Sequence, residues 1–484
     1  MLATPTRTVL IILLSGLLSR VTWGDVRLPA LVGDNMVLQR DAKIHLWGWA
    51  APGEVVRIAF RGAKATAKSD QQGRWEMFVG PFKAGGPYEM TVSGRNRLSI
   101  HNILLGDVWV ASGQSNMEFP LKHDDVHDFG GVPNAAKEIA GANYPAIRLF
   151  KLHHKIAVEP QTDVEADTWF AATPDSVGSF SAVAFLFGRE MYQRYQVPIG
   201  LIESNWGGTV AEAWMSAGAL KQFPEFDQAI ASLKQSDSGD ATPLQTDPSP
   251  MTLFNGMVAP LTPYTIKGVI WYQGESNIAR PSQYRALFPA LNKDWRSHWG
   301  YEFPFLFVQL AGFQPTGPDP ADYRWAELRE AQSMALSVPH TGMATAADVG
   351  DALDVHPKDK QDVAHRLALV AAKTVYGENI VDSGPTYQSM EIEGDAIRIK
   401  FSSLGSGLMI KDQYGYLRGF EIAAADGKFI WAQARQEGDS ILVYAENVRR
   451  PVAVRYDWMN TPDGNVYNKE GLPALPFRTD GPVQ

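Results

Sequence analysis

The stretch Gly106-Asp-Val-Trp-Val-Ala-Ser-Gly-Gln-Ser-Asn-Met-Glu-Phe119 decides the fold of this chain. Its first half, Asp107-Val-Trp-Val-Ala111, is short, apolar and β-branched, which predicts a buried strand. The small polar residues that follow predict a tight turn at the start of a helix, where backbone N–H groups lack partners. Such a turn would expose the Ser115 hydroxyl at the sheet edge, near donors for a developing oxyanion. The same residues also suit an ordinary turn, so the rest of the chain must decide between the two interpretations.

The composition is that of an ordinary globular protein of roughly two to four domains. The chain has 484 residues, of which 45% are apolar and 20% are charged. Its net charge of −9 argues against a general affinity for nucleic acid or anionic membranes, because no surplus of basic residues can neutralise phosphates. Because the sequence has no cysteine, thiol nucleophiles, disulfide chemistry and thiolate metal sites are excluded.

The N-terminus has the pattern of an export signal. Arg7 precedes a nearly uninterrupted apolar run over residues 9–18, and the small residues Thr22 and Gly24 follow. This pattern predicts a secretory signal peptide over residues 1–24, and the apolar run is too short to span a bilayer comfortably. We therefore expect an exported protein, periplasmic or secreted, with no membrane insertion after signal cleavage. A retained anchor is the alternative.

Three regions follow the signal. Residues 25–103 show short alternating strands separated by glycine and proline, which predicts a β-sandwich module. In residues 104–380 strands alternate with helices, which predicts an α/β domain with a parallel sheet and helices on both faces. The strand pattern returns over residues 381–484, where we expect a C-terminal β-rich module.

After the opening stretch, the α/β region contains predicted strands over residues 197–203, 266–272 and 304–310. Predicted helices cover Val183–Tyr195 and a segment that begins at Pro357 and carries an apolar stripe. In parallel sheets of this kind, active sites form at the carboxyl ends of the strands.

Four polar stretches lie at predicted strand ends or at a helix start. They are Gly113-Gln-Ser-Asn116, Glu203-Ser-Asn-Trp-Gly-Gly-Thr209, Trp271-Tyr-Gln-Gly-Glu-Ser-Asn277 and Asp348-Val-Gly-Asp-Ala-Leu-Asp-Val-His-Pro357. Together they provide the groups that acyl transfer needs. Ser115 would attack a carbonyl carbon, and His356 would take the serine proton and pass it to the leaving alcohol. Glu275 could serve as a second base, but its place after a buried strand favours an orienting role through hydrogen bonds.

The tetrahedral oxyanion formed by this attack needs two or three hydrogen-bond donors. A backbone N–H at Gly207 or Gly208 can approach the oxygen because no side chain obstructs it. A carboxamide from Gln273 or Asn277 is the expected further donor.

These motifs resemble those of the sialate O-acetylesterases of the SGNH hydrolase superfamily. The matching stretches are Gly113-Gln-Ser-Asn-Met117, Trp206-Gly-Gly-Thr209, Trp271-Tyr-Gln-Gly-Glu-Ser-Asn277, Asp354-Val-His-Pro-Lys-Asp-Lys360, Tyr456-Asp-Trp-Met-Asn460 and the run from Val466 to Arg478. The resemblance implies a flavodoxin-like α/β/α SGNH hydrolase core that uses no metal or cofactor. It also implies that Ser115 is the nucleophile, that His356 is the base and that the Ser115 amide joins the oxyanion hole.

The triad acid departs from the superfamily pattern. That acid usually lies three residues before the histidine, a position that Leu353 occupies here. Asp354 is the nearest replacement, and Asp348 and Asp351 are alternatives if the loop folds back.

The sequence thus predicts a carbohydrate O-acetylesterase of the sialate type, acting on an O-acetylated carbohydrate through an acetyl-enzyme. Two alternatives remain. One is an acetylesterase for plant polysaccharides such as acetylated xylan or xyloglucan. The other is a non-catalytic carbohydrate-binding protein built around an inactive hydrolase core. A sialate carboxylate would require an arginine near Ser115.

Overall fold

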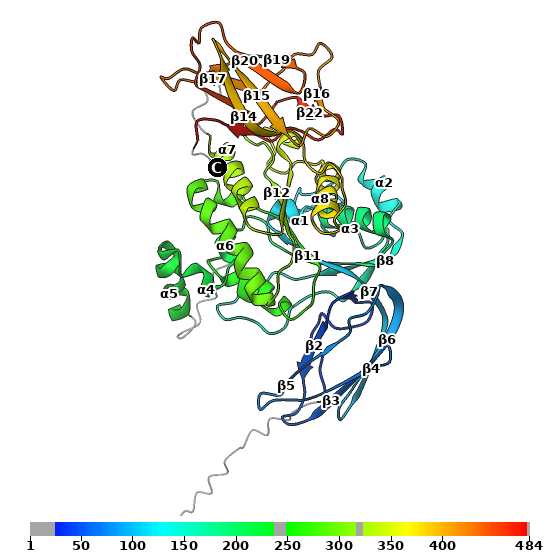
Figure 1. The fold of residues 1–484 in the computed structure, drawn as a ribbon. Helices are drawn as coiled ribbons and strands as arrows, with labels where there is room; N and C mark the ends of the chain where they lie inside the picture. The colour runs from blue at the N-terminus through cyan, green and yellow to red at the C-terminus, as the bar shows by residue number, and fades with distance from the viewer. Residues whose placement is uncertain (1–24, 237–247, 316–322, 482–484) are drawn as a thin grey trace, which may run out of the picture.

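The computed structural model describes residues 25–236, 248–315 and 323–481, which form three parts in sequence order (Figure 1). The predicted signal peptide, residues 1–24, lies outside the described residues. Among the residues described, no helix is both long enough and apolar enough to cross a membrane.

The central part is built on a sheet whose strands are buried on both faces. Its parallel strands are β7 (Arg97–Gly113), β8 (Tyr144–Lys151), β10 (Ile199–Asn205), β11 (Gly268–Tyr272), β12 (Phe305–Gln309) and β13 (Thr341–Thr345), and the antiparallel edge strand is β9 (Phe170–Ala172). The spatial order is β13-β12-β11-β7-β10-β8-β9. The five adjacent strands β10-β7-β11-β12-β13, numbered in chain order with β8 left out, follow the flavodoxin-like order 2-1-3-4-5, which confirms the predicted fold class.

Helices cover both faces of this sheet (Figure 1). On one side lie α3 (Ala182–Tyr195) and α8 (Lys360–Thr374), and on the other lie α6 (Pro281–Trp299) and α7 (Arg324–Met334). Side chains cap the first pair: the Ser181 hydroxyl accepts the N–H of Ala184, and Asp359 accepts the N–H of Asp362. The shorter helices are α1 (Ser115–Glu118), α2 (Ala135–Ala140), α4 (Ala217–Leu220) and α5 (Asp227–Ser236).

The N-terminal β module is continuous with the central sheet. Its strands are β1 (Val37–Gln39), β2 (Ile44–Trp49), β3 (Val55–Phe60), β4 (Ala63–Lys68), β5 (Arg74–Val79) and β6 (Gly85–Ser93). β6 pairs with the first half of β7, and the second half of β7 forms the centre of the α/β sheet. The boundary predicted after residue 103 therefore falls inside one strand rather than in a linker.

The C-terminal module has a hydrophobic core of its own. Its strands are β14 (Thr386–Glu393), β15 (Ala396–Ser402), β16 (Leu408–Ile410), β17 (Phe420–Ala423), β18 (Ile430–Trp431), β19 (Gln433–Glu437), β20 (Ser440–Tyr444), β21 (Ala453–Tyr456), β22 (Val466–Asn468) and β23 (Phe477–Arg478). The module contacts the central part through hydrogen bonds, including Tyr467 Oη to Asp348 Oδ2 at 3.0 Å and Phe313 N to Asn460 O at 3.1 Å. These contacts reach the loops at the carboxyl ends of β12 and β13.

Candidate active site

Ser115 lies where β7 ends and the chain turns into α1. Gly113 makes this turn possible, since its φ is +137° and a Cβ there would lie 2.1 Å from the carbonyl oxygen of Tyr272. The next amide, Gln114 N, donates to that same oxygen at 3.0 Å. Ser115 therefore lies at the carboxyl end of β7, beside β11, where the strand order of the sheet reverses and ligands bind in such folds.

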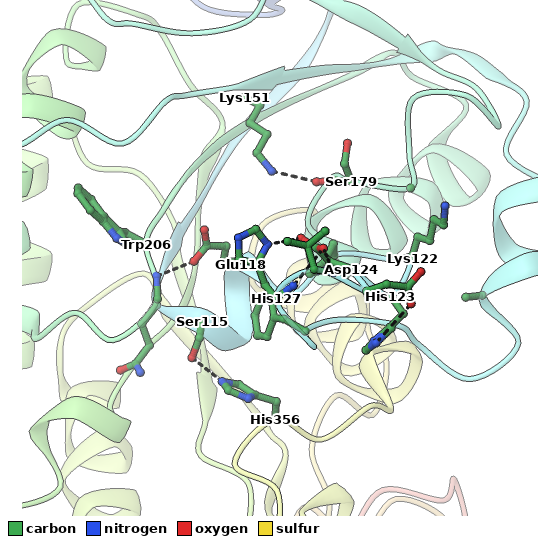
Figure 2. A pocket seen from close by; sticks show the side chains of 18 of the residues that line it. Ser115, Glu118, Lys122, His123, Asp124, His127, Lys151, Ser179, Trp206 and His356 are labelled. Carbon is green, nitrogen blue, oxygen red and sulfur yellow. Dashed lines mark hydrogen bonds and ion pairs between the residues drawn. The ribbon is translucent and has the colours of Figure 1, made fainter.

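His356 faces Ser115 across 241 residues of sequence. Its Nε2 lies 2.8 Å from Ser115 Oγ, and Figure 2 shows the two side chains pointing toward each other. Burial lowers the pKa of His356, the nearby Lys360 ammonium lowers it further, and Asp354 acts in the opposite direction. The net effect keeps the imidazole neutral, the form that can accept the serine proton.

Among the three predicted acids, only Asp354 lies beside His356. Its Oδ1 is 3.6 Å from His356 Nδ1, beyond hydrogen-bond range, and accepts the backbone N–H of His356 at 2.9 Å. Asp348 instead holds the Arg366 guanidinium with both oxygens, at 2.6 and 2.9 Å. Asp351 accepts only the backbone N–H of Leu353, at 2.8 Å. The structure therefore does not bring the alternatives Asp348 and Asp351 to His356.

The two predicted glycine donors differ in their contacts. The Gly207 N–H donates to Glu118 Oε2 at 2.6 Å, so a carboxylate already occupies that donor. A Cβ at Gly207 would lie 3.3 Å from Ser115 Cβ, which places this glycine directly against the serine. Gly208 lines the same pocket in a left-handed conformation, with φ of +74°. Among the described residues nothing holds its N–H, which leaves that donor available.

The structure corrects the role predicted for Gln273 and Asn277. Gln273 Nε2 donates to Thr209 O at 3.1 Å and to Asn277 Oδ1 at 2.7 Å, while Asn277 Nδ2 donates to Glu212 Oε2 at 3.0 Å. Both side chains are buried, and neither lines the pocket around Ser115. These contacts hold the segment after β10, which carries both glycines, against the end of β11. In this geometry the two amides are engaged in supporting that segment and do not face Ser115.

Ser115 and His356 open into a pocket of about 1600 Å³. One wall carries Trp206, and the loop over residues 120–129 lies on the other side of Ser115 (Figure 2). Phe129 of that loop packs edge-on against the His356 ring, with 5.1 Å between the ring centroids. The described residues that line this pocket include Lys122 and Lys151 but no arginine.

Comparisons with known proteins identify the family of this chain. A family model for carbohydrate esterases, described as sialic acid-specific acetylesterases, matches residues 105–373. That range is more than half of the chain and contains both Ser115 and His356. The chain belongs to this family.

Relatives of this acetylesterase family match most of the chain. The mouse sialate O-acetylesterase is 31% identical and the alignment covers 97% of each protein, and the human enzyme is 34% identical over 77% of this chain and 76% of its own. Among solved structures, a carbohydrate acetylesterase from Xanthomonas citri is 39% identical, with a TM-score of 0.84 and coverage of 94% of this chain and 99% of that one. The resemblance inferred from the motifs is thereby confirmed.

Sequence reasoning missed one acidic residue of this candidate site. Glu118 follows Ser115 by three positions, about one helical turn, and so lies on the same side of α1. Its Oε1 is 3.1 Å from His154 Nε2, and the His154 ring stacks on Trp206 at 4.1 Å between centroids. The spacing from Ser115 could have indicated Glu118. No local pattern predicts His154, which comes from the segment after β8.

Proposed function

We propose that this acetylesterase cleaves acetyl esters of sugar hydroxyls with Ser115 as the nucleophile and His356 as the general base. The observation that carries the proposal is the 2.8 Å contact between Ser115 Oγ and His356 Nε2 at the edge of a large pocket. A nucleophile and base within hydrogen-bond reach, at a strand end, form the arrangement that acyl transfer requires.

In the first half-reaction Ser115 Oγ attacks the acetyl carbon while its proton passes to His356 Nε2. The carbonyl oxygen becomes an oxyanion, and we assign its stabilisation to hydrogen bonds from the backbone N–H groups of Ser115 and Gly208. The bond from the acetyl carbon to the sugar oxygen then breaks. His356 returns its proton to that oxygen, so the sugar leaves as an alcohol and the acetyl group stays on Ser115.

In the second half-reaction water replaces the sugar. His356 takes a proton from the water, the resulting hydroxide attacks the acetyl carbon, and the bond to Ser115 Oγ breaks as His356 reprotonates the serine. Acetic acid is released and loses its proton to solvent, which leaves acetate. We assign Asp354 an electrostatic role, because its 3.6 Å separation from Nδ1 is too long for a triad hydrogen bond.

The substrate is the second part of the proposal. The mouse and human relatives are named for sialate esters, but a sialate carboxylate needs a cationic partner. Of the two lysines lining the described pocket, Lys151 is paired with Glu203 at 3.2 Å and donates to Ser179 O. This leaves Lys122 as the candidate contact for an anionic sugar. The scarcity of free cations favours acetylated neutral glycans, the alternative that the sequence left open.

Acetate release from 9-O-acetyl sialosides and from acetylated xylan and xyloglucan, measured side by side, tests this assignment. Faster release from the polysaccharides is the expected result. A clear preference for the sialosides would overturn the choice of neutral glycans while leaving the esterase mechanism in place.

The variant Ser115→Ala tests the mechanism itself. We expect the turnover of p-nitrophenyl acetate to fall by about 10³-fold or more, while Ser232→Ala, an exposed serine on α5, keeps full activity. Normal turnover by Ser115→Ala would refute the mechanism. Glycan binding with no acetate release by the unmodified protein would instead support a non-catalytic binding protein.

A further inference from the structure

Two ionisable side chains lie beside the proposed catalytic pair, Lys360 fully buried and Glu275 half-buried at the pocket wall. Lys360, the first residue of α8, is fully buried, and its Nζ donates to Asn116 Oδ1 at 2.5 Å. The ammonium lies over the rings of Phe119 and Tyr272, at 4.5 and 5.4 Å from their centroids. The nitrogen of the same amide, Asn116 Nδ2, donates a hydrogen bond to Glu275 Oε1, also at 2.5 Å. One asparagine thus joins a buried cation to a carboxyl group.

The amide of Asn116 also connects the two catalytic segments. Besides Glu275, its Nδ2 donates to the backbone oxygen of Val355 at 3.0 Å. Asn116 directly follows Ser115, and Val355 directly precedes His356. The oxygen of the amide and both of its N–H groups are therefore occupied, and the side chain can hardly rotate without breaking one of these contacts. This single side chain restrains the separation of Ser115 and His356.

Burial shifts the pKa values of both ionisable groups in this cluster. It lowers the pKa of Lys360 to about 7, and it raises the pKa of Glu275. Glu275 Oε2 has no hydrogen-bond partner among the described residues. Two apolar side chains of similar size would fill the same space at a lower desolvation cost, so stability alone gives little reason for a lysine here.

Building on the proposed function, we propose that Lys360 is a positioning residue. Through Asn116 it fixes the geometry between Ser115 and His356, and its positive charge favours the neutral form of His356. The charged groups that act on His356 are Lys360 and Asp354, and those that act on Lys360 are Glu275, Asp354 and Asp359. Lys360 touches neither the substrate nor the reacting atoms.

The rate of p-nitrophenyl acetate hydrolysis as a function of pH tests this role. Lys360→Met removes the charge and the hydrogen bond, and Lys360→Gln removes the charge but keeps a donor near Asn116. Because the positive charge lowers the pKa of His356, its removal raises that pKa. We therefore expect the acidic limb of kcat/KM to move to higher pH by roughly half a unit or more in both variants.

The two variants should differ in the size of the activity loss. At the pH optimum we expect kcat/KM to fall by about 10- to 100-fold in Lys360→Met and by less in Lys360→Gln, since the glutamine preserves part of the positioning. Lys373→Met is the matched control, because Lys373 is an exposed lysine of the same helix paired with Asp382 at 2.6 Å. Its pH profile should match that of the unmodified enzyme.

The outcomes separate this inference from the proposed function. An unmoved acidic limb in both Lys360 variants, with Ser115→Ala inactive, would overturn the positioning role and leave the mechanism intact. Normal turnover by Ser115→Ala would overturn the mechanism itself. If circular dichroism shows that Lys360→Met does not fold, the position of the acidic limb of kcat/KM in Lys360→Gln decides whether Lys360 has the positioning role.

Discussion

The two halves of the catalytic pair are held in different ways. Ser115 sits between the buried side chains of Gln114 and Asn116, at the end of a strand whose second half is buried on both faces. His356 lies in an irregular loop before α8, in which the Leu353 side chain is 86% exposed and the Asp354 side chain 44% exposed. The sheet places the nucleophile, whereas contacts from outside the loop place the base.

These outside contacts come from two segments, α1 and the loop after β12. The amide of Asn116 holds Val355 O, and Gln314 N donates to the oxygen of Ala352 at 3.1 Å. Gly350 packs so closely on Gly312 that a Cβ there would lie 2.3 Å from the Gly312 nitrogen. Changes on the serine side should therefore disturb folding and activity together, whereas changes in the histidine loop should mainly shift activity.

The largest effect should come from Gly113→Ala on the serine side. The added Cβ would meet the Tyr272 carbonyl oxygen at 2.1 Å, and the φ of +137° disfavours any L side chain. We expect the free energy of unfolding, measured by urea denaturation, to fall by about 3 kcal/mol or more. Esterase activity should fall with it.

Gly300→Ala is the control for this change, because its φ is also positive, at +76°, but open space surrounds the added Cβ. It should cost only about 1 kcal/mol. Equal losses in the two variants would mean that the close approach to Tyr272 does not matter, and the serine side would then be no more constrained than a helix terminus.

An intermediate effect is expected from Asp354→Asn in the histidine loop. Because Asp354 does not hydrogen-bond Nδ1, kcat/KM should fall by about tenfold or less, well short of the roughly 10⁴-fold loss seen when a hydrogen-bonded triad acid is neutralised. The carboxylate raises the pKa of His356, so its removal lowers that pKa and moves the acidic limb of kcat/KM to lower pH. This direction is opposite to the one expected for Lys360→Met.

The pH profile of kcat/KM measures both parts of this prediction, with Asp351→Asn as the control from the same loop. A loss near 10⁴-fold would show that the loop closes onto His356 during turnover and forms a full triad. The contrast between a fixed nucleophile and a loosely supported base would then hold only for the resting enzyme.

The smallest effect should come from Leu353→Ser, at the position where the superfamily pattern has its acid. The leucine side chain is 86% exposed, so we expect stability to change by no more than about 0.5 kcal/mol and activity to stay the same. Leu367→Ser, in the fully buried face of α8, should by contrast cost several kcal/mol, on the order of 3. A large activity loss in Leu353→Ser would show that substrate or a closed loop covers this side chain.

Several features of the site could be predicted because their signals are local. The apolar run before Ser112 fixes a strand, Gly113 permits the turn, and the polar residues at successive strand ends converge once the sheet is parallel. The helix predicted over residues 183–195 differs from α3 by one residue at its start. The pairing of Ser115 with His356 followed from motifs that lie at such strand ends.

Other features could not be predicted, because they depend on which groups meet across the fold. Gln273 carries a side-chain amide of the kind that can donate to an oxyanion. That amide instead donates hydrogen bonds to Thr209 and Asn277, whose positions only the packed structure fixes. Likewise, three aspartates lie within eight residues before the histidine, and the partnership of Asp348 with Arg366 and Tyr467 removes one of them.

By itself, the sequence determined the α/β class, the strand-to-helix turn at Ser115 and the family, because periodicity, glycine placement and short motifs are properties of neighbouring residues. Only the tertiary structure decided which acid lies beside His356, which amides remain free to act and how Lys360 and Asn116 join the two catalytic segments. The physical reason is that a hydrogen bond or a buried charge is defined by its partner, and here the partners lie up to 244 residues apart.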